Sequence, residues 1–165
     1  MRLFDRTRKT IEAAAAARRD GDAPAAIDLL ADVLDADPAH VAANAEMARA
    51  LRLIGDPAEA EAYYRVALEG VLEYSLVVEL SEALVEQGKV ADAETVLDAA
   101  LVMAQGNPRL DPGEALIVRA TIALAQQRTG DAAEALDLIV PKRASKRTKA
   151  LAASLRERLS GQADT

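Results

Sequence analysis

The chain has 165 residues, with 27 acidic and 20 basic side chains, a net charge of −7 and no cysteine. Without a thiol there can be no disulfide, no thiolate metal site and no cysteine nucleophile. The composition is 51% hydrophobic but only 2% aromatic, which favours helix over sheet, and the length suits one domain with its own core.

Basic and acidic residues are unevenly distributed along the chain. Residues 1–19 carry 6 basic and 2 acidic side chains, residues 20–141 carry 7 and 23, and residues 142–158 carry 7 and 1. No stretch approaches the roughly 18 consecutive apolar residues of a membrane-spanning helix. The first residues also lack the apolar core of a secretory signal. We therefore expect a soluble, cytoplasmic protein with positive ends and an acidic middle.

Four segments in chain order begin with a glycine and continue as an amphipathic helix. These glycines are Gly21, Gly55, Gly88 and Gly130, with spacings of 34, 33 and 42 residues. Alanine follows each glycine after five residues and a large apolar residue after nine. The alanines are Ala26, Ala60, Ala93 and Ala135, and the apolar residues are Leu30, Tyr64, Leu97 and Ile139. Apolar residues three and four apart also precede the glycines, so each segment predicts a helix, a glycine turn and a second helix.

Local signals predict where several of these helices begin and end. Asp56 is expected to cap a helix that starts at Pro57, and Asp131 to repeat that cap. Pro141 should stop the last repeat helix early, because the residue before a proline avoids the helical conformation. A further helix over about 144–160 is expected to cover the open end of the repeats.

These segments resemble tetratricopeptide repeats, a family of helix-turn-helix units of about 34 residues. The residues that carry the resemblance are Ala48, Ser81 and Ala123 in first helices, Ala26, Ala60, Ala93, Ala67 and Ala100 in second helices, and Pro38 between repeats. The resemblance implies an all-α, right-handed α-solenoid of TPR-like repeats with a C-terminal capping helix. Within a single domain over 1–165, the repeats are expected at about 7–40, 41–73, 74–107 and 116–141.

Catalytic motifs are missing from the sequence. It contains no nucleophile elbow, no phosphate-binding loop and no metalloprotease motif. The one histidine, His40, is expected at the surface in a turn between repeats. We therefore expect no enzymatic activity, no catalytic residue, no metal and no cofactor.

The resemblance implies that first helices line a concave groove, in which the family holds a peptide or helix of another protein. The chain is thus expected to be a non-catalytic adaptor or scaffold. The expected groove residues are Arg18, Arg19, Arg49, Arg52, Glu82, Val85, Glu86, Leu124, Gln127 and Arg128. The basic first half would suit an acidic segment, although cations near helix C-termini are also favoured by the helix dipole.

Chaperone-binding members of the family use lysine and asparagine side chains to clamp a C-terminal carboxylate. The corresponding positions here hold Ile11, Ala15, Glu46, Ser75 and Glu79. Binding to chaperone tails is therefore not expected.

A second basic segment lies near the C-terminus. Its residues are Lys142, Arg143, Lys146, Arg147 and Lys149. One interpretation is a solvated face of the capping helix. Another is a contact with the acidic middle of a neighbouring copy, which would make the chain a self-assembling scaffold and a homo-oligomer. Nucleic acid and membrane are not expected as partners, because no aromatic residue interleaves the cations and the acidic body would repel phosphates.

Overall fold

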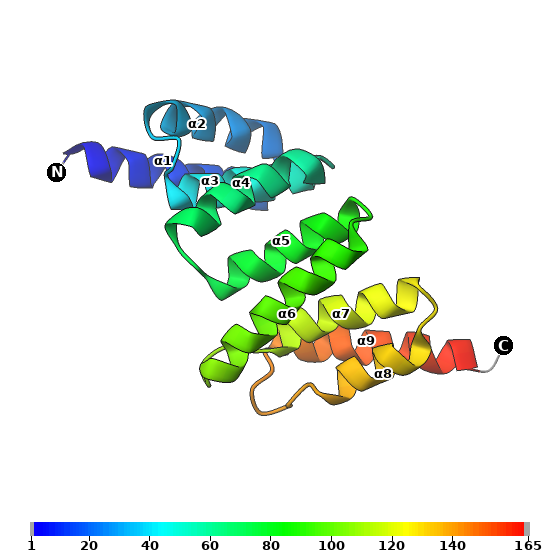
Figure 1. Cartoon of the computed structure of the whole chain (residues 1–165). Helices are drawn as coiled ribbons and strands as arrows, with labels where there is room; N and C mark the ends of the chain where they lie inside the picture. The colour runs from blue at the N-terminus through cyan, green and yellow to red at the C-terminus, as the bar shows by residue number, and fades with distance from the viewer. Residues whose placement is uncertain (1, 164–165) are drawn as a thin grey trace. The chain divides into compact units, whose positions relative to one another are not determined.

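The computed structural model describes residues 2–163, and their side chains from residue 5 to residue 161 (Figure 1). Over these residues the chain forms α-helices and no strand, as the composition predicts. The described chain falls into two compact units, the first reaching Gly88 and the second starting at Lys89. The grouping of all repeats into one domain stays a prediction.

The first unit contains five helices. They are α1 (Arg2–Arg19), α2 (Ala23–Ala36), α3 (Val41–Leu53), α4 (Pro57–Gly70) and α5 (Tyr74–Glu86). Helix α1 packs on α2, and α3 packs on α4, so successive helices form hairpins. Helix α3 also contacts α1 and α2, and α4 contacts α5, which joins the hairpins into one unit.

The second unit contains the remaining described helices. They are α6 (Val90–Gly106), α7 (Gly113–Ala125), α8 (Thr129–Asp137) and α9 (Lys146–Ala163). Helix α7 contacts α6, α8 and α9, so it lies at the centre of the unit. Helix α8 ends before Pro141, as predicted, and α9 is the C-terminal helix expected over about 144–160. Its contacts with α7 and α8 cover the last hairpin.

Side chains at the helix N-termini explain where the helices of the first unit begin. The Oδ1 atom of Asp56 accepts a hydrogen bond from the backbone N–H of Glu59 at 3.0 Å, which confirms the predicted cap of α4. Asp22 caps α2 in the same way, through the N–H of Ala25 at 3.0 Å. His40 is the N-cap of α3, because its Nδ1 atom accepts from an N–H of the first turn. These caps satisfy donors that a helix leaves unpaired at its start.

The turn of the fourth repeat has a different register from the one predicted. In the first three repeats the turn residue is a glycine with positive φ, as at Gly55, where φ is +85°. In the fourth it is Gln127, with φ of +60°, whereas Gly130 lies inside α8. The backbone N–H of Arg128 then bonds the carbonyl of Ala123 at 2.8 Å, which closes the end of α7. The turn therefore falls three residues before the predicted position.

This shift changes which residues of the fourth repeat are equivalent to those of the others. Counted from Gln127, they are Ala120, Ala132 and Leu136, in place of Ala123, Ala135 and Ile139. The positions seven before, five after and nine after each turn residue are at most 1% exposed throughout. They are Ala14, Ala48, Ser81 and Ala120, then Ala26, Ala60, Ala93 and Ala132, then Leu30, Tyr64, Leu97 and Leu136. Small side chains at the first two positions let the helices of a hairpin approach closely.

The predicted cap at Asp131 is wrong for the same reason. Helix α8 begins at Thr129, two residues before Asp131, and its N-cap residue Arg128 makes no side-chain capping bond. The carboxylate of Asp131 instead bonds the Arg128 guanidinium at 2.7 Å.

Replacing Gln127 by glycine is expected to stabilise the chain by up to about 1 kcal/mol, because a non-glycine residue is strained at positive φ. Chemical denaturation of the variant measures the change. Ala99→Gly is the control, since this exposed residue lies in the middle of α6, where glycine should cost about 1 kcal/mol. Equal losses in both variants would contradict the assigned turn.

Candidate functional site

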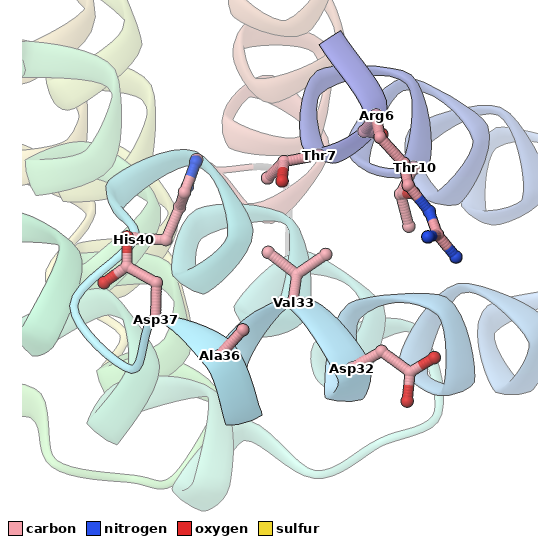
Figure 2. Close-up of a pocket in the computed structure, with 8 residues that line it drawn as sticks. All are labelled: Arg6, Thr7, Thr10, Asp32, Val33, Ala36, Asp37 and His40. Carbon is pink, nitrogen blue, oxygen red and sulfur yellow. Dashed lines mark hydrogen bonds between the residues drawn. The ribbon is translucent and has the colours of Figure 1, made fainter. Parts of the chain in front are cut away.

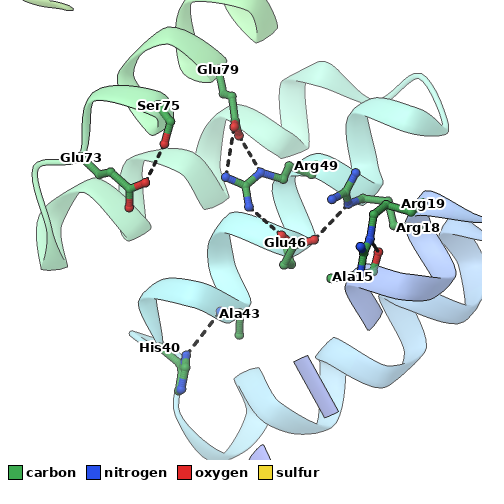
Figure 3. A network of polar contacts seen from close by, with 10 residues as sticks. All are labelled: Ala15, Arg18, Arg19, His40, Ala43, Glu46, Arg49, Glu73, Ser75 and Glu79. Carbon is green, nitrogen blue, oxygen red and sulfur yellow. Dashed lines mark hydrogen bonds and ion pairs between the residues drawn. The ribbon is translucent and has the colours of Figure 1, made fainter. Parts of the chain in front are cut away.

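A row of arginine and glutamate side chains runs across α1, α3 and α5 (Figure 3). The Nε atom of Arg18 donates to Oε2 of Glu46 at 3.0 Å. The other carboxylate oxygen of Glu46 accepts from Nη1 of Arg49 at 2.6 Å. Arg49 also makes a two-pronged pair with Glu79, at 2.7 Å from Nε and 3.0 Å from Nη2. Two carboxylates thus hold Arg49 from opposite sides.

Arg52 extends this row to the end of α5. Its Nη1 atom donates to Glu82 at 2.9 Å, and its Nη2 atom donates to Glu86 at 2.5 Å. We call the whole set the arginine–glutamate row. Its members are Arg18, Glu46, Arg49, Glu79, Arg52, Glu82 and Glu86. The pairs between helices join residues 28, 30 and 34 positions apart, close to one repeat, so they connect successive hairpins.

The two central arginines are strongly held in their charged form. Burial by itself would lower the pKa of Arg49, but the hydrogen bonds and charges of Glu79 and Glu46 raise it above its ordinary value. Burial would likewise lower the pKa of Arg52, but Glu86 and Glu82 raise it above its ordinary value. Both side chains are mostly covered, at 26% and 19% exposure, so solvent screens these pairs less than it screens surface pairs. Both arginines therefore stay charged near neutral pH.

Tyr64 of α4 lies close to this row and is fully buried. Its hydroxyl makes no hydrogen bond within the described residues. Burial and the charge of Glu79 raise the pKa of this hydroxyl, against the opposite effect of Arg52, so it stays protonated. Leucine occupies the equivalent position in the other repeats, as at Leu30 and Leu97. Tyr64 is therefore a packing residue, as the repeat pattern predicts.

The arginines of the predicted basic first half of the groove are largely paired within the chain. Arg18, Arg49 and Arg52 do lie in one row, but each already binds a carboxylate of the chain itself. An acidic segment would have to displace these glutamates from Arg49 and Arg52. The terminal nitrogens of Arg18 and Arg19 make no bond to any described residue, because each side chain is held only through Nε. The open donors are thus confined to the α1 end of the row.

The remaining predicted groove residues are divided between the two units. Val85 is half-buried on α5, whereas Leu124 is only 4% exposed and belongs to the core of the second unit. Leu124 therefore cannot contact a partner in an open groove. Gln127 forms the turn, and Arg128 bonds Glu94 of α6 at 2.7 Å, which is the main reason that the pKa of Arg128 is raised.

The basic C-terminal segment divides into a structural arginine and four open cations. The Nη2 atom of Arg143 donates to three backbone carbonyls, of which Leu110 is the nearest at 2.8 Å. The other four side chains are exposed and make no ion pair with any described residue. We call them the basic end, and they are Lys142, Lys146, Arg147 and Lys149.

A carboxylate fixes the start of α9, on which three members of the basic end lie. The Oδ2 atom of Asp111 accepts from the N–H of Ser145 at 2.9 Å and from the hydroxyl of Thr148 at 2.8 Å. Its Oδ1 atom accepts from the N–H of Gly113 at 2.9 Å, where α7 begins. Thr148 is 1% exposed, so this contact is sheltered from water. Asp111 and Arg143 therefore fix the backbone of the basic segment to the ends of α6 and α7.

A cavity of about 380 Å³ lies between α1 and α2 (Figure 2). Its lining residues are Arg6, Thr7, Thr10, Asp32, Val33, Ala36, Asp37 and His40. The Nδ1 atom of His40 accepts from the N–H of Ala43 at 3.3 Å, so the ring is engaged in capping α3. No hydrogen bond joins His40 to a side chain of Asp32 or Asp37, so the lining lacks a base held by a carboxylate. The half-buried position of His40 in its turn agrees with a structural role.

Two general features of the described residues bear on the class of site. No cluster of three or more histidine, cysteine or carboxylate side chains within residues 5–161 has the arrangement to bind a metal ion. Among the helices of the described range, none is both long and apolar enough to cross a membrane.

Helical hairpins that repeat about every 34 residues, with small residues where their helices cross, define an all-α helical-repeat protein. Two tetratricopeptide repeat family models match the sequence, one over residues 17–71 and the other over residues 78–147. The chain belongs to the tetratricopeptide repeat family, as the sequence predicts. Such repeats commonly bind other proteins and are typically non-catalytic.

A solved structure supports the same fold. It is a tetratricopeptide repeat protein from Parabacteroides merdae, which superposes with a TM-score of 0.69 and is 23% identical in sequence. The match covers 96% of this chain and 61% of that protein, so this chain spans less than two thirds of its length. No curated protein matches the chain. At this identity the likeness is one of fold, and the sites must be argued from the chain's own residues.

Proposed function

We propose that the chain is a non-catalytic adaptor that holds a segment of another protein against the first helices of its first unit, at the α1 end of the arginine–glutamate row. The observation that carries this proposal is the pair of open guanidinium ends at Arg18 and Arg19. Each has a bonded Nε atom and terminal nitrogens that make no bond to any described residue. Guanidinium forks of this kind bind carboxylates with two parallel hydrogen bonds, which suits an acidic segment.

The arginines of the row therefore have two roles in this proposal. Arg49 and Arg52 are used within the chain, because all of their nitrogens bond glutamates. Arg18 and Arg19 supply the contact with the partner. Arg19 is exposed, and its only bond is to a carbonyl of its own helix, so it can turn toward a ligand at little cost.

Capture of partners from a lysate by the immobilised chain, read by mass spectrometry, tests this proposal. Arg19→Glu is expected to remove most of the partner signal while leaving stability nearly unchanged, because Arg19 makes no ion pair. Arg109→Glu is the control, since Arg109 is likewise an exposed arginine without an ion pair to any described residue but lies in the second unit. Equal capture by wild type and Arg19→Glu would overturn the proposed contact.

A further inference from the structure

The basic end gathers four cations in one short segment. Lys142, Lys146, Arg147 and Lys149 are exposed and make no ion pair with any described residue, whereas Arg49 and Arg52 bind glutamates. Because Asp111 and Arg143 fix the backbone of this segment, these cations are presented without the ordering cost of a loose tail. Two apolar residues between α8 and α9 are also exposed, Leu138 at 58% and Val140 at 46%.

Helix α2 carries a surface of matching character. Asp28, Asp32 and Asp35 are exposed and make no ion pair with any described residue. Their spacing of four and three residues places them on one helix face over about 10 Å, opposite the buried side of α2. Leu29 lies beside this stripe and is 37% exposed. We call these three residues the aspartate face.

We propose that the basic end of one copy binds the aspartate face of a second copy. The chain itself supplies both surfaces, with Leu138 and Val140 next to the cations and Leu29 next to the aspartates, which is the composition of a small interface with a polar rim. Since each copy has one surface of each kind, the contact joins unlike surfaces. It therefore closes into a ring or dimer or continues as an open chain.

This contact goes beyond the proposed adaptor function, because it uses neither Arg18 nor Arg19. A second copy fits the basic end better than nucleic acid does. No aromatic side chain lies among the four cations to stack on bases, whereas the aspartate face offers three carboxylates at helical spacing with Leu29 beside them.

Sedimentation velocity of the full chain at about 100 μM tests for association in the micromolar range. At about 20 mM salt the mass is expected to exceed the 17.5 kDa of one chain, and at about 500 mM it should return to that value, because salt screens the contact.

Two charge-reversed variants make the test specific. One carries Lys146→Glu, Arg147→Glu and Lys149→Glu, and the other carries Asp28→Lys, Asp32→Lys and Asp35→Lys. Each variant alone should be monomeric at low salt, because one of its surfaces is repelled. An equimolar mixture should associate, since each reversed surface then meets its complement. A control with Glu59→Lys and Glu69→Lys changes exposed acids of α4 and should associate like wild type.

Two results would overturn the proposal. One is a wild-type chain that stays monomeric at low salt, and the other is a mixture of reversed variants that fails to associate. Binding of the monomeric wild type to a labelled DNA duplex or to phosphatidylserine vesicles, lost on reversing the basic end, would assign that surface to an anion instead. None of these outcomes depends on partner capture through Arg19, so the two proposals fail independently.

Discussion

Replacing Arg49 by methionine is expected to lower the free energy of unfolding by about 1–3 kcal/mol, measured by urea denaturation. The variant leaves Glu79 without its two-pronged partner and leaves Glu46 with Arg18 alone. Carboxylates at 25% and 12% exposure are poorly hydrated when they lose their cation. The loss is below that of a fully buried pair because water still reaches both groups.

Arg8→Met is the matched control for this prediction. Arg8 pairs with Glu12 at 3.2 Å, but both side chains are more than half exposed, so the loss should stay below about 0.5 kcal/mol. Similar small losses in both variants would mean that the row adds nothing to stability beyond ordinary surface pairs.

Alanine is expected to have opposite effects at two helical glycines of the second unit. A Cβ atom on Gly113 would lie 2.5 Å from the Cγ2 atom of Thr148 and 2.8 Å from Oδ1 of Asp111. Thr148 is buried and bonded to Asp111, so it has little room to move. Gly113→Ala should therefore destabilise the chain by about 1–3 kcal/mol.

Gly130→Ala should instead stabilise the chain by about 0.5–1 kcal/mol, because this glycine is helical and a Cβ atom there meets no neighbour within 4 Å. Thermal unfolding of Gly113→Ala and Gly130→Ala measures the sign of the change in stability for each variant. A loss of stability in Gly130→Ala would restore the predicted register, in which Gly130 is the turn glycine, and would contradict the turn at Gln127.

The repeat pattern predicts most of the fold because its signals are local. Positive-φ glycines, aspartate caps and alanines at helix crossings each act within one hairpin. They therefore predict the positions of the helices of the first unit accurately. The fourth repeat shows the limit of this reasoning. Gln127 occupies a conformation that glycine prefers, and a glycine stands three residues later at Gly130, so the residue types indicated the wrong turn.

The pairing of the arginines was harder to predict because it joins different repeats. In the sequence, Glu46 and Glu79 stand out only as positions where chaperone-binding members of the family carry a carboxylate clamp. A signal was nevertheless present: Arg49 and Glu79 stand 30 residues apart, and Arg52 and Glu86 stand 34 apart. Opposite charges separated by about one repeat are candidates for contacts between successive first helices.

The cations of the chain therefore fall into two groups, those bonded within the chain and those with unbonded donors. Arginines in the middle of the row connect hairpins and Arg143 fixes the start of α9, whereas both proposals place the partner contacts on cations that still have unbonded donors. A count of basic residues on a groove therefore overestimates its attraction for an acidic segment when the neighbouring repeat supplies glutamates.

A double-mutant cycle on Arg49 and Glu79 tests most directly whether Arg49 is held within the chain. The free energies of unfolding of wild type, Arg49→Met, Glu79→Gln and the double variant give the coupling between the two side chains. Their two bonds of 2.7 and 3.0 Å predict a coupling of about 1 kcal/mol or more, so that the double variant loses less than the sum of the single losses. Additive losses, with no coupling, would show that Arg49 is not held by Glu79 and would return it to the surface available to a partner.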